Sequence, residues 1–290
     1  MKTKRSVRYL LLAITIGMFL TACRKKEDGR IALDSDTSGA TDNALAQGTF
    51  NDASNISDQG AAGNLSSYSA TYEGSDLRGI LSQCATITRT SNGGTHKVTI
   101  NFGATDCLCS DGRKRRGAII IDFAGQGTLI QAYNDSLSVN KHIITFYQYY
   151  VNENHVEGTH IITNNGHNSN GHLNYTIEVS GGKITKPSGG GVVNWQSFRT
   201  REWTEGEGTS AFDDDVYLIN GNASGTQANG TSFTETATNL KIAIDCPYIK
   251  SGVLQFTPSG KPVRSIDFGN GTCDQNATVT ISGYVFNIIL

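Results

Sequence analysis

The sequence predicts an all-β protein: an antiparallel strand-rich meander, closed into a sandwich or curled into an open, barrel-like sheet. Three observations predict this class. Apolar and polar residues alternate with a period of two through much of the chain after Leu65. Glycine is frequent, at 33 residues, whereas proline is scarce, at 4, which suits many short strands joined by turns. After residue 22 no segment has a sustained helical period, so the crossover helices that parallel strands need are not expected.

The chain begins with a basic segment and a short apolar run, the order that is typical of a secretory signal. The run from Tyr9 to Leu20 is too short to span a hydrocarbon core, which takes roughly 20 residues. Small residues then precede a cysteine, Leu20-Thr21-Ala22-Cys23, and this run resembles the lipobox of type II signal peptides. The resemblance implies a bacterial outer-membrane lipoprotein, cleaved before Cys23 and acylated (palmitate) on that residue. The alternative is a plain secretory signal with a chance cysteine.

The residues after Cys23 bear on where such a lipoprotein is delivered. Arg24 stands where some bacterial lipoproteins carry the Asp that retains them at the inner membrane. The run Lys26-Glu27-Asp28 resembles charged signals that send certain Gram-negative lipoproteins to the outer face of the outer membrane. This resemblance implies a protein that is lipid-anchored in the outer membrane and displayed at the cell surface, with the periplasmic face as the alternative.

These features divide the chain into three parts: a signal peptide (1–22), a lipid anchor with a disordered tether (23–64), and a single β-rich domain (65–290). The tether is composed mainly of small and polar residues, with Phe50 as its single aromatic side chain. Such a segment cannot bury enough apolar surface to offset its conformational entropy. The alternative is that Phe50 and Ile56 dock on the domain and move its boundary.

Strands are expected where alternation is bounded by Gly, Asn and Ser. In the first clear strand, Val98, Ile100 and Phe102 share one face. A turn around Asn165 and Gly166 predicts a hairpin. The expected strands are 96–102, 117–123, 137–151, 154–163, 171–179, 182–187, 191–203, 215–220, 231–245, 252–257, 262–268 and 277–290.

A pattern G-x5-I-x-F-G-x3-C occurs twice, from Gly94 to Cys107 and from Gly260 to Cys273. Each copy has a further cysteine upstream. The pattern predicts two similar strand–turn units, near 84–125 and 246–283, with coincidence in a Gly- and Ile-rich chain as the alternative. The second copy also resembles a turn-and-cysteine pattern of uncharacterised secreted, β-rich lipoproteins of Gram-negative bacteria, which implies no particular activity.

Of the 6 cysteines, Cys23 is assigned to lipid, and the others enter an oxidising compartment in which pairing is expected. The repeat predicts disulfides Cys84–Cys107 and Cys246–Cys273, so that Cys109 has no assigned disulfide partner. The alternatives are Cys109 in place of Cys107, or a zinc site at Cys107-x-Cys109, although the usual C-x2-C pairs are absent.

Two groups of side chains are candidate metal ligands. His160 and His172 fall on neighbouring strands of the predicted hairpin, where two imidazoles would suit Zn²⁺ or Cu²⁺. Asp213 and Asp215 belong to an acidic group that also includes Glu202, Glu205, Glu207 and Asp214, and carboxylates in such a loop would suit Ca²⁺. The alternative for both groups is a solvated polar surface without a cofactor.

The candidate ligand-binding residues are Trp195, Arg199, Arg201 and Trp203, which share one face if 191–203 is a strand. If exposed, this strip would suit a sugar ring or a partner protein. The alternative is an inward tryptophan with arginines directed toward solvent. The run Arg113–Arg116 is expected to be a solvated loop tip, with a basic patch for anionic glycan as the alternative.

Removal of residues 1–22 changes the formal charge from −2 to −6, so nothing points to a nucleic-acid partner. The chain carries no G-x-S-x-G, H-E-x-x-H or P-loop motif. The sequence therefore favours a lipid-anchored cell-envelope protein that acts as a non-catalytic binding or structural module, with surface glycan or an envelope protein as partner. The alternative is a carbohydrate-active hydrolase that uses a pair of carboxylates from the acidic loop.

Overall fold

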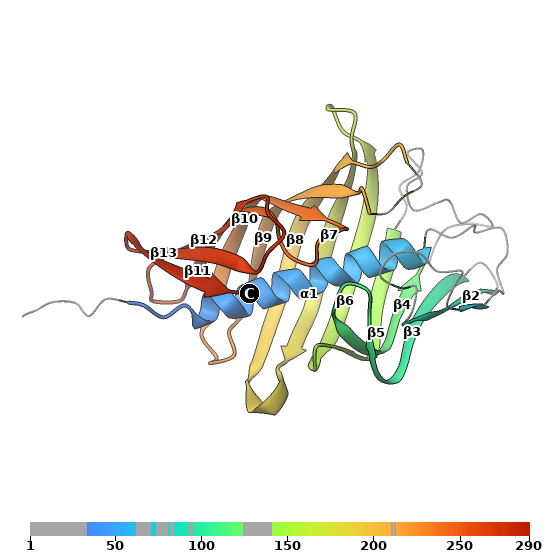
Figure 1. The fold of residues 1–290 in the computed structure, drawn as a ribbon, viewed down its shortest axis with the longest axis horizontal. Coiled ribbons are helices and arrows are strands. Elements are labelled where there is room, and N and C mark those ends of the chain that lie inside the picture. The colour runs from blue at the N-terminus through green and yellow to red at the C-terminus, as the bar shows by residue number, and fades with distance from the viewer. Residues whose placement is uncertain are drawn as a thin grey trace, which may run out of the picture. The chain divides into compact units, whose positions relative to one another are not determined.

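A computed structural model of the chain describes residues 34–61, 71–73, 81, 84–92, 95–123, 141–209, 211 and 213–290. Its strands form one 14-stranded sheet whose order, β1 to β14, is the order of the sequence. Neighbouring strands pair antiparallel from β1–β2 through β13–β14. The predicted all-β antiparallel meander is thus confirmed (Figure 1).

The strand bounds agree with most of the predicted ranges, but the first two strands, Thr71–Glu73 and Thr86–Asn92, were not predicted, and two predicted stretches divide differently. The predicted strands 171–179 and 182–187 are a single strand, interrupted by a register shift between Val179 and Gly182. The predicted strand 277–290 is two, because the chain turns at Ser282 and Gly283, both with positive φ. The bounds are β1 Thr71–Glu73, β2 Thr86–Asn92, β3 Thr95–Leu108, β4 Lys114–Asp122, β5 Lys141–Val151, β6 Asn154–His167, β7 Leu173–Thr185, β8 Val192–Glu205, β9 Val216–Thr226, β10 Ser232–Ala243, β11 Ser251–Pro258, β12 Arg264–Asn270, β13 Asn276–Ile281 and β14 Tyr284–Ile289, with a 3₁₀ turn at Pro187–Gly189.

A long helix, α1 (Ser38–Ala61), lies where the sequence predicted a disordered tether. It packs across the strands and contacts β3, β4, β8 and β11 (Figure 1). Phe50 and Ile56, both residues of this helix, are almost fully buried. The compact body therefore begins at Ser35, and the predicted domain boundary at residue 65 is wrong. The prediction failed because α1 is polar around most of its circumference, so it has no apolar stripe to reveal it.

Local features explain how this polar segment becomes a helix. Asp36 precedes α1, and its carboxylate accepts hydrogen bonds from the Ser38 N–H (3.1 Å) and Ser38 hydroxyl (2.6 Å), which caps the first turn. Small residues let the sheet approach closely: at Gly60 an added Cβ would lie 2.3 Å from Ile100 Cδ1. Packing of the helix against the sheet, more than its own propensity, thus stabilises α1.

The sheet curls around α1, which decides between the predicted sandwich and the open, barrel-like sheet in favour of the latter. The loop between β3 and β4 meets the loop between β10 and β11, because the Arg113 guanidinium donates to the carbonyl oxygen of Pro247. In a flat sheet, β4 and β10 would lie about 29 Å apart, six spacings of about 4.8 Å. Only strong curvature brings these loops together, and Arg113 also reaches Asp52 of the helix that lies between them.

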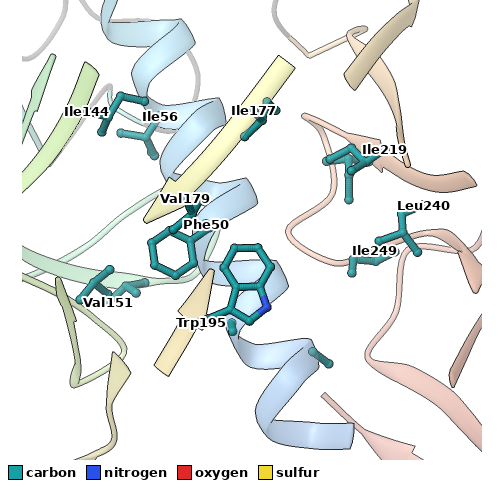
Figure 2. Close-up of a cluster of buried hydrophobic side chains, with 14 of the residues drawn as sticks. Phe50, Ile56, Ile144, Val151, Ile177, Val179, Trp195, Ile219, Leu240 and Ile249 are labelled. Carbon is teal, nitrogen blue, oxygen red and sulfur yellow. The ribbon is translucent and has the colours of Figure 1, made fainter. Parts of the chain in front are cut away.

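The core lies between α1 and the inner face of the sheet. Phe50 stacks on Trp195, with ring centroids 5.1 Å apart and an interplanar angle of 9°. Figure 2 shows this pair among branched aliphatic side chains that include Ile144 and Val179. As predicted for the first clear strand, Val98, Ile100 and Phe102 point into this core. Phe50 therefore anchors the middle of the helix to the middle of the sheet.

The repeated pattern forms two equivalent units at opposite ends of the sheet. Disulfides Cys84–Cys107 and Cys246–Cys273 each join the segment before one strand to the end of the next, which confirms the predicted pairing. Cys109 is unpaired and buried. The two units agree in further detail, because Gly103 and Gly269 both have a φ near 90°, 86° and 90°.

The same turn closes both units. The Gly103 N–H donates to Asn101 Oδ1 (2.9 Å), and the Gly269 N–H donates to Asp267 Oδ1 (2.8 Å). In each unit an Asx side chain two residues earlier stabilises the left-handed glycine. This shared geometry, together with the disulfides, shows that the sequence repeat is a structural repeat rather than a coincidence.

Candidate functional site

The interior holds a network of charges between α1 and the sheet. Asp52 of α1 accepts from Arg115 of β4 (2.7 Å) and from Arg113 (2.6 Å). Arg115 is fully buried and also contacts Asp111 (2.6 Å). The prediction of a solvated loop tip over 113–116 is therefore wrong for Arg115, because the strand turns this side chain inward toward the helix carboxylate.

Further pairs fix α1 along its length. Arg201 of β8 donates to Asp58 (2.7 Å), and both side chains are buried. Arg199, two residues earlier on the same strand, donates to Gln47 (2.7 Å) and to Glu235 of β10. Because an unpaired buried charge is very costly, these pairs specify which helix residue faces which strand. They hold the helix and leave their charges committed to one another.

This network overturns the predicted ligand-binding strip. Trp195, Arg199, Arg201 and Trp203 do share one face of β8, but that face is the inner one. Their side chains are 2%, 1%, 1% and 7% exposed. The Trp-Arg pattern reflects packing against a polar helix, with Arg201 also lying 4.3 Å from the Tyr217 ring centroid. No sugar ring or partner can reach these residues in the folded protein.

The predicted histidine pair is not brought together either. β6 and β7 are joined by a turn at 168–171, later than the predicted turn at Asn165-Gly166, so His160 lies opposite Val179. His160 is buried, with Nε2 3.3 Å from Ser54 Oγ of α1. His172 is partly exposed and contacts Glu202, with 2.8 Å between Nδ1 and Oε1.

The acidic group is likewise dispersed. Glu207 contacts His167 and the Leu173 N–H, whereas the Asp214 carboxylate accepts from the Thr209 hydroxyl. Asp213 is exposed, and Asp215 is buried beside the Tyr217 hydroxyl (3.4 Å). Within the described residues no group of three or more His, Cys, Asp or Glu side chains is placed to hold a metal ion.

Several interior groups have shifted pKa values, each with a physical cause. Burial by itself would raise the pKa of Asp52, but the Arg115 and Arg113 charges outweigh burial and lower it below its ordinary value. Burial and the nearby Arg201 charge lower the pKa of His142 and His160 to about 3. Burial and the Asp58 charge raise the pKa of Asp215 to about 7. At neutral pH the two histidines are therefore uncharged.

A small cavity with a mixed polar and apolar wall lies where the two loops meet over α1. Its volume is about 60 Å³, and its wall includes Asn51, Asp52 and Asn55 of the helix together with Asp245 and Tyr248 of the β10–β11 connection. Since a water molecule needs about 10–15 Å³ in such a measure, this space suits a few waters rather than a sugar. The carboxylate of Asp52 that reaches it is already paired with Arg113.

The outer face of the sheet carries a different kind of surface. Beyond Glu202, Glu205 and Lys241, which lie together at one end, the outward side chains over β8 to β11 are mainly amides and hydroxyls, with one exposed aromatic residue, Phe198 (57% exposed). We call this surface the neutral face. It comprises Asn194, Gln196, Phe198, Thr200, Asn220, Asn222, Ser224, Thr226, Ser232, Thr234, Thr236, Thr238, Gln255 and Thr257.

Cross-strand hydrogen bonds order the neutral face. Asn194 donates to Thr226 (2.9 Å), and Gln196 donates to Ser224 (3.0 Å). In the same register, Phe198 lies between Glu178 of β7 and Asn222 of β9. Sequence reasoning missed this face because it followed the tryptophans of β8 rather than the residues that alternate with them. The alternation itself was the available signal.

No family model, curated protein or solved structure matches the chain. No helix in the described residues is long and apolar enough to cross a membrane.

Proposed function

We propose that the chain is a lipid-anchored cell-envelope protein whose curled sheet is a non-catalytic binding module, with the neutral face as the surface that holds a neutral glycan. The lipobox-like run before Cys23 supports the anchor, and the two disulfides suit an exported chain. The anchor on Cys23 places the body outside the cytoplasm, at the outer membrane.

The observation that carries the binding role is the chemistry of the neutral face. Amide and hydroxyl groups both donate and accept hydrogen bonds, as sugar hydroxyls do. Soluble protein surfaces ordinarily carry charges at about a quarter to a third of positions, so an extended uncharged face is unusual. On β8, where this face borders β7, Phe198 offers an exposed apolar ring against which the C–H face of a sugar can pack.

The start of α1 bears on how far such an anchor lets the body lie from the membrane. With α1 as part of the body, 14 residues separate Cys23 from Ser38, in place of the 41 of the predicted tether. Fully extended, 14 residues reach about 50 Å, because each residue spans at most about 3.6 Å. We infer that the module works close to the membrane surface.

The anchor is tested by Cys23→Ala, which should abolish incorporation of labelled palmitate and release the protein from membranes. Binding is tested with the soluble chain from Arg24 onward on an array of neutral and anionic glycans. We expect retention on neutral glycans, and a loss of at least tenfold in affinity for Phe198→Ala. Tyr147→Ala is the matched control, because Tyr147 is an equally exposed aromatic residue (62%) outside the neutral face. Equal losses in both variants, or binding to anionic glycans alone, would refute the assignment.

A further inference from the structure

The last strand of the sheet, β14, has a neighbour on one side alone. It pairs with β13 over its whole length, from Asn276↔Ile289 to Ile281↔Tyr284. Among the described strands none lies along its second side. An edge of this kind presents backbone donors and acceptors in the plane of the sheet, where another strand can pair with them.

The register identifies which backbone groups point away from β13. The Leu290 N–H donates to the Gln275 carbonyl oxygen (2.9 Å), so residue 290 belongs to a hydrogen-bonded pair. Hydrogen-bonded and non-hydrogen-bonded pairs alternate along an antiparallel ladder. The N–H and C=O groups of Val285, Asn287 and Ile289 are therefore directed to the free edge.

The side chains of the edge favour pairing rather than oppose it. Val285 and Ile289 are 63% and 72% exposed, and Tyr284 is 56% exposed. Proteins usually protect an edge with lysine, proline or a bulge. The segment from Tyr284 to Leu290 contains no charge and no proline, and its pairing with β13 has no register shift.

We propose that β14 is a self-association edge, at which a second copy of this chain adds its own β14 antiparallel. A twofold axis through Asn287 would bring each copy's Asn287 opposite its counterpart in a hydrogen-bonded pair. Val285 of each copy would then face Ile289 of the other, so that the most exposed apolar side chains cover one another. A second copy is the occupant because the segment is neutral and matches itself in this register.

The association joins two sheets into one continuous sheet across the dimer. It buries one short strand on each side, so it belongs with small interfaces, below about 1,200 Å², and dissociates readily in dilute solution. The proposal is independent of the lipid anchor and of the neutral face.

Site-directed cross-linking provides the test. Asn287→Cys should form a disulfide-linked dimer under mild oxidation, because paired Cα atoms about 5.5 Å apart allow such a bond. The matched control is Ser180→Cys. Ser180 is also exposed, but it lies on β7, a strand with neighbours on both sides. Circular dichroism of both variants establishes that each remains folded.

Sedimentation of the soluble chain up to about 1 mM gives a second readout. We expect a monomer–dimer equilibrium that Ile289→Lys weakens at least tenfold, because the variant loses the apolar contact with Val285 of the other copy at both ends of the paired strands and places a lysine on the edge. Leu108→Lys, an exposed apolar residue at the end of β3, should leave it unchanged. A chain that stays monomeric up to about 1 mM, or that cross-links no more through residue 287 than through residue 180, would overturn the proposal.

Discussion

The carboxylate of Asp52 and the guanidinium of Arg115 lie 2.7 Å apart, Oδ1 to Nη2, with the side chains 3% and 0% exposed. One comes from a segment of low hydrophobicity near the N-terminus and the other from a basic run 63 residues later. A buried charge is costly without opposite charges around it, and here Asp111 and Arg113 complete the network about this pair. The pairing of Asp52 with Arg115 explains why a polar helix and a sheet with inward arginines belong to one fold.

Removing one partner of this pair should destabilise the protein strongly. Asp52→Asn leaves the Arg115 charge buried without its main counter-charge, and we expect a loss of about 3–5 kcal/mol in the free energy of unfolding. Urea titration followed by circular dichroism measures it. The control is Lys261→Gln, which breaks the exposed pair with Asp36 (Lys261 38% and Asp36 39% exposed), keeps the Asp36 cap of α1 and should cost about 0–1 kcal/mol. Similar losses in the two variants would contradict a buried network.

The pH dependence of stability follows from groups that titrate differently in the folded and unfolded chain. His142 and His160 have a folded pKa of about 3, so between about pH 6.5 and pH 4 the unfolded chain binds their two protons and the folded chain does not. Asp215 has a folded pKa of about 7, so over the same window the folded chain holds one proton that the unfolded chain has lost. The histidines therefore destabilise the fold on acidification, and Asp215 opposes them.

In this window the unfolded chain therefore binds one proton more than the folded chain. The free energy of unfolding then falls by about 1.4 kcal/mol for each pH unit of acidification. Asp215→Asn removes the opposing contribution, and the slope should roughly double. His160→Gln removes one of the two protons that the unfolded chain alone binds, and the slope should fall toward zero. Urea midpoints measured at half-unit steps from pH 4.5 to 6.5 give the three slopes. If Asp215→Asn and the unaltered protein have the same slope, Asp215 is not protonated in the fold.

How much of this structure was predictable depends on which interactions are local. Alternation is a local signal, so strands such as 96–102 and the antiparallel class were predicted, and the repeat predicted both disulfides. The helix over 38–61 was not, because its stability comes from arginines more than 50 residues away. The wrong prediction for β8 has the same cause, because helix α1 was not predicted. Without the polar helix, a strand with Trp195, Arg199 and Arg201 on one face suggested a ligand surface.

Each of the two disulfides should stabilise the protein. They close loops of 23 and 27 residues, for which loop entropy gives about 3–4 kcal/mol each. Cys84→Ser/Cys107→Ser and Cys246→Ser/Cys273→Ser should each lose about this much, and the quadruple variant measures the coupling that the contact between Arg113 and Pro247 provides between the two units. Urea titration measures each loss. Mapping of non-reduced peptides is the control, and a Cys84–Cys109 link in the unaltered protein would show that the assigned pairing is wrong.

Two glycines of α1 offer a direct test that this segment is a packed helix. At Gly48 an added Cβ meets no atom within 4 Å, so Gly48→Ala should gain about 0.5–1 kcal/mol from helix propensity alone. At Gly60 the added Cβ would overlap Ile100, which is itself fully buried, and Gly60→Ala should lose about 1–3 kcal/mol. Thermal and urea unfolding measure both changes. The same substitution thus has opposite signs at two positions 12 residues apart, because one faces open space and the other faces the sheet. In a disordered tether neither would change the stability of the folded domain, so two neutral results would restore the tether and remove the helix from the body.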